Sequence, residues 1–215
     1  MPCIGPRRKG GTASFCRQIF FWGLCLLVVA GCGKPPAIRP LAADATVLAF
    51  GDSLTFGTGA RPDESYPAVL ATLLGCSVIN AGVPGEVTAE GLARLPQVLD
   101  EHGPDLVILC HGGNDFLRRQ NREETKANLR RMIALVKERG IDLLLLGVPE
   151  PGLLVSPAPL YKELAGEFGV PCDDETIRAI LTDRGLKSDQ IHPNGAGYRQ
   201  LAEAVAALIR EAGGG

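Results

Sequence analysis

Residues 45–54 read ATVLAFGDSL, a run of apolar side chains that ends in a glycine, an aspartate and a serine. The run Ala45–Phe50 has the length and composition of a buried β-strand. Gly51 permits a tight turn after the strand, and Ser53 stands on that turn. A serine in this position presents its hydroxyl at the edge of a sheet, where a substrate can reach it.

Short apolar runs alternate with helical patterns along the rest of the chain, which predicts an α/β fold with a parallel sheet of about five strands and helices on both faces. The predicted strands are Thr46–Phe50, Ser77–Asn80, Leu106–Cys110, Leu143–Gly147 and a short segment near Val170–Cys172. The predicted helices are Tyr66–Leu74, Ala89–Leu99, Glu123–Arg139, Leu160–Phe168 and a final helix through residues 198–209. Pro96 predicts a kink or a break in the second of these helices.

The composition is that of a soluble α/β protein, with 46% hydrophobic and 21% charged residues among 215. The formal net charge of −2 hides an asymmetry, because the first 31 residues hold four basic side chains and no acidic one. Without those four, the remaining 18 basic and 24 acidic residues give a net charge of −6. A mildly acidic body without a basic patch argues against binding of nucleic acid.

Residues 1–31 have the pattern of an export signal, in which a basic segment precedes an apolar run of 12 residues, Ile19–Ala30. That run is too short for a membrane-spanning helix, which needs ~20 residues. Val29–Cys32 resembles the lipobox of bacterial lipoproteins, where cleavage before the cysteine is followed by its acylation. An uncleaved signal anchor, or an ordinary signal peptide with an incidental cysteine, is the alternative.

The expected organisation is a signal peptide over 1–31, a lipidated Cys32 with a flexible tether over 32–44, and one catalytic domain over 45–215. The protein is then expected to face the periplasm from a membrane, and the outer membrane is favoured because Gly33 is not the aspartate associated with retention at the inner membrane. Three cysteines remain in the domain, Cys76, Cys110 and Cys172, without the spacing of metal ligands. We expect neither a disulfide framework nor a metal site, and one bond between two of the three cysteines in an oxidising compartment stays the alternative.

Polar segments follow the first three predicted strands and precede the last helix. Residues 80–85 read NAGVPG, 112–115 read GGND and 189–194 read DQIHPN. Because the carboxyl ends of parallel strands meet at one edge of a sheet, we expect Ser53 to lie close to the first two segments. The base that serine needs is supplied by His192, which Asp189 can orient from three residues earlier on a helical turn.

Acyl transfer also needs hydrogen-bond donors where charge develops on the carbonyl oxygen, each worth roughly 3–4 kcal/mol. The candidates are the Ser53 N–H, a glycine N–H within residues 80–85 and the amide of Asn114. From the residues alone, the glycine could be Gly82 or Gly85.

These four blocks, in this order, resemble the SGNH (GDSL) hydrolases over the whole body of the chain from about Ala45. The sequence is most similar to the bacterial thioesterase, lysophospholipase and arylesterase branch, which residues 91–96 (GLARLP) also resemble. The resemblance implies a flavodoxin-like three-layer αβα sandwich without metal or cofactor. It implies a Ser53 nucleophile, a His192 base, an orienting Asp189 and an oxyanion hole of Ser53, Gly85 and Asn114. Gly85 is preferred because the family glycine follows Asn-Ala after three further residues, and Gly82 stays the alternative.

The remaining polar residues near these blocks are interpreted as structural. Asp52 is expected to stabilise the turn, Asp115 to bond its own loop, and His111 to be solvated or to face the core rather than the pocket. Asp173–Glu175 is read as the acidic start of a helix rather than a metal site. Residues 149–155 (PEPGLLV) are expected to form an apolar wall or lid over the acyl group, with packing of Leu153, Leu154 and Val155 on the body of the domain as the equal alternative.

The sequence therefore predicts an esterase that hydrolyses carboxylic esters of small molecules or lipids, with thioesters and lysophospholipids as further substrates, through an acyl-enzyme on Ser53. One alternative is the removal of O-acetyl groups from a polysaccharide. Another is a binding lipoprotein that keeps the fold without catalysis.

Overall fold

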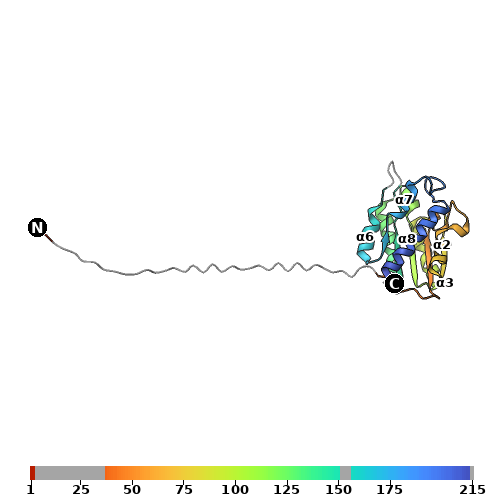
Figure 1. The fold of residues 1–215 in the computed structure, drawn as a ribbon, viewed down its shortest axis with the longest axis horizontal. Coiled ribbons are helices and arrows are strands. Elements are labelled where there is room, and N and C mark those ends of the chain that lie inside the picture. The colour runs from red at the N-terminus through yellow and green to blue at the C-terminus, as the bar shows by residue number, and fades with distance from the viewer. Residues whose placement is uncertain (3–36, 151–155, 214–215) are drawn as a thin grey trace. The chain divides into compact units, whose positions relative to one another are not determined.

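The computed structural model describes residues 1–2, 37–150 and 156–213. Its centre is a five-stranded sheet in the order β2-β1-β3-β4-β5 with every pair parallel (Figure 1). The strands are β1 (Thr46–Gly51), β2 (Ser77–Gly82), β3 (Leu106–Cys110), β4 (Asp142–Leu146) and β5 (Cys172–Asp173). This is the flavodoxin-like strand order, so the predicted fold class is confirmed.

The helices pack in two groups, as a three-layer sandwich requires. In one group α2 (Tyr66–Leu74) packs on α8 (Gly195–Gly213), and α8 on α7 (Thr176–Thr182). Figure 1 shows α2 and α8 beside each other on the same side of the sheet. In the other group α5 (Arg122–Glu138) packs on both α3 (Thr88–His102) and α6 (Pro159–Phe168). Three short elements complete the described chain: α1 (Ser53–Phe56), the 3₁₀ turn η1 (Pro62–Glu64) and α4 (Gly113–Leu117).

The long elements match the predictions within a few residues, and the differences have physical causes. Helix α3 is not interrupted at Pro96, because Leu95 and Leu99 are buried on either side of the proline and hold the helix on the core. The helices α1, α4 and α7 are missing from the prediction, since four to seven residues are too few to show a helical period. Helix α7 does begin directly after the acidic residues Asp173–Glu175, as expected.

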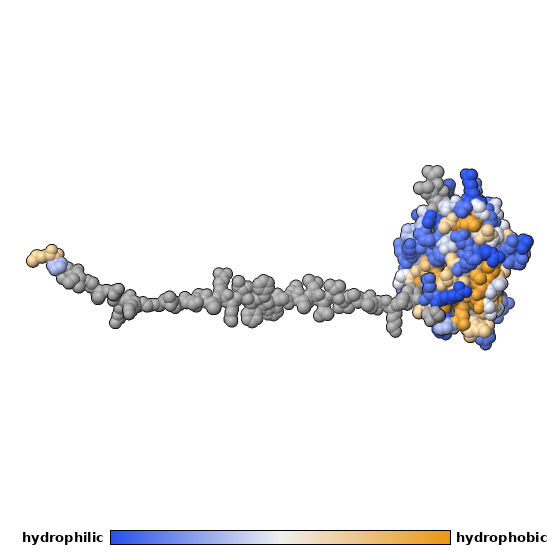
Figure 2. Space-filling view, in the orientation of Figure 1, coloured by the Kyte–Doolittle hydropathy of each residue, from blue (hydrophilic) through white to orange (hydrophobic). Residues whose placement is uncertain are grey.

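The strands β1 and β3 lie at the centre of the hydrophobic core. Val47–Phe50 in β1 and all five residues of β3 are fully buried, which explains why both read as nearly continuous apolar runs. The described surface is mixed, and Figure 2 shows hydrophilic and apolar residues intermingled over one face of the domain. Among the described residues no helix is long and apolar enough to cross a membrane, and Cys76, Cys110 and Cys172 are free thiols.

The register of the central strands decides where the polar segments lie. Gly51, the last residue of β1, pairs with Gly82 of β2 on one side and with Cys110 of β3 on the other. The three strands therefore end at the same level, and the segments that follow them start from one edge of the sheet. Gly51 does not adopt a positive φ; its requirement is space, because an added Cβ would lie 2.1 Å from the Cys110 carbonyl oxygen.

The expected tether is shorter than the sequence indicated. Ile38 is buried, and its N–H donates to the Ala212 carbonyl at the end of α8. Arg39 donates from both its backbone N–H and its side chain to Asp142, at 2.8 and 2.9 Å. The expectation of a flexible tether is therefore wrong at Ile38 and Arg39, because a single isoleucine among prolines shows no period in the sequence yet packs on an apolar site of the domain.

Substitution of Gly51 by alanine is expected to lower the free energy of unfolding by about 3 kcal/mol, because the new methyl group has no space between β3 and α1. The matched control is Gly166→Ala in α6, where an added Cβ meets nothing within 4 Å. That change should raise stability by roughly 0.5–1 kcal/mol, as alanine is the better helix former. Urea denaturation of both variants measures the difference, and equal stability of the two would contradict the packing argument.

Candidate active site

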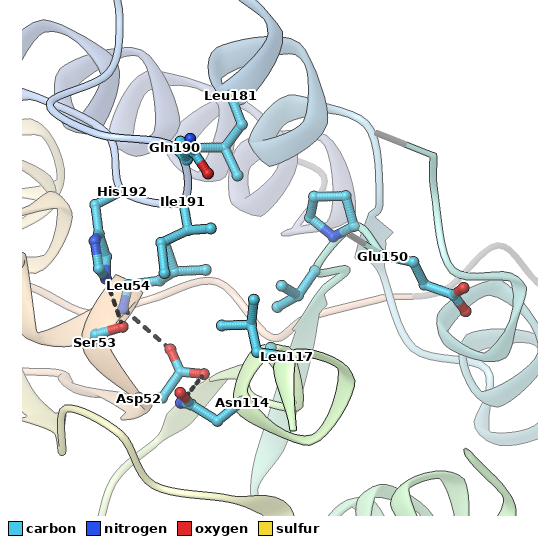
Figure 3. Close-up of a pocket in the computed structure, with 13 residues that line it drawn as sticks. Asp52, Ser53, Leu54, Asn114, Leu117, Glu150, Leu181, Gln190, Ile191 and His192 are labelled. Atoms are coloured by element: carbon cyan, nitrogen blue, oxygen red, sulfur yellow. Dashed lines mark hydrogen bonds between the residues drawn. The ribbon is translucent and has the colours of Figure 1, made fainter. Parts of the chain in front are cut away.

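Ser53 is the first residue of α1, directly beyond the buried end of β1. The preceding residue, Asp52, caps this short helix by accepting a hydrogen bond from the Leu54 N–H at 3.0 Å. The cap turns the chain sharply, so the Ser53 side chain stands at the sheet edge, and Figure 3 shows it pointing toward His192. Asp52 therefore stabilises the turn, as the sequence indicated.

The structure brings Ser53, His192 and Asp189 together. His192 Nε2 lies 3.1 Å from Ser53 Oγ, and His192 Nδ1 lies 2.8 Å from Asp189 Oδ2 (Figure 3 draws the first contact). The second oxygen, Asp189 Oδ1, accepts the backbone N–H groups of Ile191 and His192 at 2.8 and 2.9 Å. Burial raises the pKa of Asp189, but the bonds from the imidazole and the two N–H groups together outweigh it and lower the pKa. The carboxylate thus stays charged and holds the imidazole with Nε2 toward the serine.

The loop that carries Asp189 and His192 is fixed by close contacts on both sides. Ser188 N–H donates to the His192 carbonyl at 3.0 Å and closes the loop on itself. An added Cβ at Gly59, whose φ is +98°, would lie 2.1 Å from Ser188 Oγ, so only glycine permits this approach. Asn194 then caps α8 by accepting the Gly197 N–H. His192 is therefore held by the start of α8 and the turn after α1.

A cavity of about 280 Å³ opens at Ser53 and His192. Its wall is largely apolar and comes from five separate segments, with the side chains of Leu54, Leu117, Val148, Leu181 and Ile191. Figure 3 shows Leu117, Leu181 and Ile191 around the space beside Ser53. Leu117 and Ile191 are 44% and 37% exposed, so the mouth of the cavity is apolar as well.

Asn114 lines the same cavity from the first turn of α4. Its Nδ2 donates to the Glu86 carbonyl at 3.0 Å and, more weakly, to Asp52 Oδ2 at 3.3 Å (Figure 3 draws the second bond). Burial raises the pKa of Asp52 above its ordinary value.

Gly112, with φ +114°, precedes the helix, and its missing side chain leaves room for the Tyr161 hydroxyl to donate to the His111 carbonyl. The glycines of this segment thus do allow close backbone approach.

The structure distinguishes the two candidate glycines. The Gly82 N–H lies within β2 and donates to Asn80 Oδ1 at 3.0 Å, so it is already engaged. Gly85 lies in the following loop with φ +83°, and among the described residues its N–H has no acceptor. Gly85 does not itself line the cavity; it is joined to the site through the neighbouring Glu86, whose carbonyl binds Asn114.

A buried polar cluster under this loop was not predicted from the sequence. Glu86 accepts two hydrogen bonds from Arg94, at 2.7 and 2.8 Å, and lies 3.0 Å from His111 Nε2. The Gly112 N–H donates to His111 Nδ1, so the proton of the neutral ring is on Nε2. This Nε2–H donates a hydrogen bond to Glu86. His111 is fully buried and faces the core, as expected, but its partner Glu86 was missed. The available signal was the position of Glu86 directly after Gly85.

A second buried contact joins the start of α3 to α4. Asp115 accepts both the backbone N–H and the hydroxyl of Thr88, the first residue of α3, with the N–H at 2.9 Å. The Thr125 hydroxyl of α5 also donates to Asp115. Asp115 therefore connects α4 with α3 and α5 rather than bonding only its own loop, which corrects the sequence interpretation.

Two further predicted features lie largely outside the described residues. Cys32 and the export signal fall within 3–36, and most of the expected apolar wall falls within 151–155. Of that wall, Pro149 and Glu150 are described, and both line the cavity. No group of three or more histidine, cysteine, aspartate or glutamate side chains suited to a metal ion occurs in the described part of the chain.

Comparison with known proteins gives the same class as the fold and the site. Residues 49–200 match the profile of the GDSL-like Lipase/Acylhydrolase family. The chain is 33% identical to an arylesterase of Vibrio mimicus over 171 residues, covering 74% of this chain and 86% of the relative. It is 35% identical over 180 residues to thioesterase 1/protease 1/lysophospholipase L1 of Escherichia coli K12, covering 80% and 86%. The crystal structure of TesA superposes with a TM-score of 0.70 at 28% identity, covering 78% of this chain and 99% of that one.

A flavodoxin-like sheet with a serine and a histidine in contact at its carboxyl edge defines a serine ester hydrolase. The chain belongs to the GDSL-like lipase/acylhydrolase family.

The Glu86 cluster makes the stability of the fold depend on pH. Burial raises the pKa of Glu86, but the hydrogen bonds from His111 and Arg94 outweigh it and lower the pKa from 4.5 to about 2. Folding therefore gains stability from the ionised Glu86 above about pH 4.5, and this gain is lost as the pH falls from there toward 2. Urea denaturation of Glu86→Gln should show lower stability at neutral pH and a flatter loss of stability on acidification.

The matched control is Glu101→Gln, at an exposed glutamate in the last turn of α3. This variant should keep the pH dependence of the wild type. Parallel stability curves for Glu86→Gln and the wild type would contradict the shifted pKa.

Proposed function

We propose that Ser53 is the nucleophile of a carboxylic ester hydrolase, with His192 as the general base and Asp189 as the residue that orients it. The observation that carries the proposal is the 3.1 Å contact between Ser53 Oγ and His192 Nε2, continued at 2.8 Å to Asp189. Asp189 keeps Nδ1 protonated, which leaves the Nε2 lone pair free to accept the serine proton.

The reaction follows in two steps. Ser53 Oγ attacks the ester carbonyl while its proton moves to His192 Nε2, and the imidazolium then protonates the departing alcohol, leaving an acyl-enzyme. In the second step water attacks the acyl carbonyl, gives its proton to His192, and the acid leaves as Ser53 Oγ regains a proton. No metal or cofactor takes part in this scheme.

The negative charge that develops on the carbonyl oxygen would be received by the N–H groups of Ser53 and Gly85 and by the Asn114 amide. Neither N–H has an acceptor among the described residues, and Asn114 lines the cavity beside Ser53. Donors that are fixed before the substrate arrives stabilise the transition state without reorganisation, and each is worth roughly 3–4 kcal/mol. Gly82 is the less suitable donor, because its N–H is already bound to Asn80.

The substrate class that suits the cavity is an ester with an apolar acyl or aryl group. The apolar wall of the cavity supports this choice, with the side chains of Leu54, Leu117, Val148, Leu181 and Ile191. The similarity of the chain to an arylesterase and to a thioesterase/lysophospholipase also supports it. Aryl esters, acyl thioesters and lysophospholipids all present such a group beside a reactive carbonyl.

Replacement of Ser53 by alanine is expected to abolish hydrolysis of p-nitrophenyl esters, a loss of at least about 10⁴-fold, because no nucleophile remains in contact with His192. The matched control is Ser77→Ala, at an exposed serine where β2 begins, which should leave the rate unchanged. A phosphonate ester should label the wild type and the control on one serine, and the Ser53 variant not at all. Wild-type rates in Ser53→Ala would refute the assignment.

A series of p-nitrophenyl esters of increasing acyl length tests the substrate class. We expect kcat/KM to rise from acetyl to longer chains, since each buried methylene adds ~0.8 kcal/mol of favourable transfer. Activity confined to the acetyl ester would instead indicate an O-acetyl deacetylase. A folded wild-type protein without turnover on any ester would favour the binding lipoprotein.

We further propose that the enzyme is exported and held at a membrane through acylation of Cys32, facing the periplasm from the outer membrane. Support comes from the basic segment, the short apolar run and the lipobox-like Val29–Cys32. Two or more acyl chains give a stable anchor. Cys32→Ser should move the protein from the membrane fraction to the soluble fraction and prevent labelling by a fatty-acid analogue, whereas Cys76→Ser should do neither. Membrane retention of the unlabelled Cys32→Ser protein would favour an uncleaved signal anchor.

A further inference from the structure

The loop between β2 and α3, residues 83–87, carries Gly85 and lies beside the segment that carries Asn114. We infer that Glu86 is a positioning residue for the oxyanion hole, and that Arg94 and His111 act through it to fix the distance between the Gly85 N–H and the Asn114 amide. The inference rests on the proposed roles of Gly85 and Asn114, and it goes beyond them by assigning a function to three residues that do not line the cavity.

Glu86 is bound from both sides of this site. Its carboxylate accepts two hydrogen bonds from Arg94 on α3 and one from His111, which directly follows β3. Its backbone carbonyl accepts the Asn114 amide at 3.0 Å. Glu86 therefore contacts Asn114 through its main chain, while its side chain is bound to α3 and to the residue that follows β3.

The contact between Glu86 and His111 exists because Gly91 has no side chain. A Cβ at Gly91 would lie 2.4 Å from His111 Nε2 and 3.3 Å from Glu86 Oε2. Helix α3 thus leaves a gap at this turn, and the imidazole and the carboxylate meet inside it. Both are nearly inaccessible to solvent, so the hydrogen bonds form in surroundings of low dielectric and hold the loop rigidly.

Rigidity at this place affects the transition state more than the bound substrate. Gly85 adopts φ +83°, a conformation that a glycine leaves easily, and Arg118 fixes its carbonyl only from the exposed side of the loop. Without the anchor at Glu86, the Gly85 N–H and the Asn114 amide can drift apart. A displacement of about 1 Å is enough to lower a catalytic rate by about 100-fold.

The test uses the purified full-length chain and compares two substitutions of one buried residue. His111→Leu fills the space but removes the donor to Glu86, and should lower kcat for a p-nitrophenyl ester by about tenfold while KM changes less than about twofold. His111→Gln keeps an N–H donor at the same reach and should restore kcat to within about threefold of the wild type. Glu86→Ala removes the whole anchor and should lower kcat by about 100-fold.

Asp142→Asn is the control for stability alone, because it weakens an ion pair with Arg39 at the opposite edge of the sheet. It should lower the midpoint of thermal unfolding and leave kcat unchanged. A lower unfolding midpoint for His111→Leu with wild-type kcat would overturn the inference, as would a His111→Gln variant as slow as His111→Leu. If Glu86→Ala fails to fold, the two His111 variants decide. Absence of Ser53-dependent turnover in the wild type would instead refute the proposed function.

Discussion

The site depends on three parallel strands that end at the same level. Gly51 lies between Gly82 and Cys110, and the space that a side chain would need at Gly51 is taken by the Cys110 carbonyl and Thr55. This close packing sets α1 directly against the ends of β2 and β3. Because this packing is close, it fixes where each loop begins before any loop residue makes a contact. Ser53 and the segments that carry Gly85 and Asn114 therefore start from fixed positions at one edge of the sheet.

Buried carboxylates then hold the loops that start from this edge. Asp52, Glu86 and Asp115 are all nearly inaccessible, and each is satisfied by donors from an element other than its own: Asn114, Arg94 with His111, and Thr88. A buried charge without such partners costs several kcal/mol. Moving the loops apart would break these hydrogen bonds and incur that cost. The carboxylates therefore oppose the loosening of the site more strongly than neutral side chains would.

Sequence patterns were sufficient for the fold because each core strand is a local apolar run, and Thr46–Gly51 shows its character without reference to any other segment. The place of Ser53 follows from the end of a strand, and the pairing of Asp189 with His192 from a spacing of three residues. The pairing of Ser53 with His192 was predicted from the serine's need for a base and from the family resemblance, not from strand ends. What could not be predicted depends on tertiary contacts. Ile38 has no periodic neighbours, and its burial requires the end of α8. The Glu86 cluster joins residues from a loop, a helix and a strand end, and its decisive feature is the gap at Gly91, which no local pattern reveals.

The two halves of the site differ in how they are held. Asp189 is half exposed, with 52% of its side chain accessible, and its loop is maintained mainly by backbone hydrogen bonds and a close approach to Gly59. The segments with Gly85 and Asn114 rest on the buried carboxylate of Glu86, which pairs with Arg94 and accepts a hydrogen bond from His111. In the proposed mechanism the histidine accepts and releases a proton, and contact of its orienting carboxylate with water stabilises the charged form of that carboxylate. The proposed oxyanion donors carry out no proton transfer and are more effective the less they move. Both halves also contribute apolar side chains to the cavity, since Ile191 belongs to the loop of Asp189 and His192 and Leu117 ends the helix that carries Asn114.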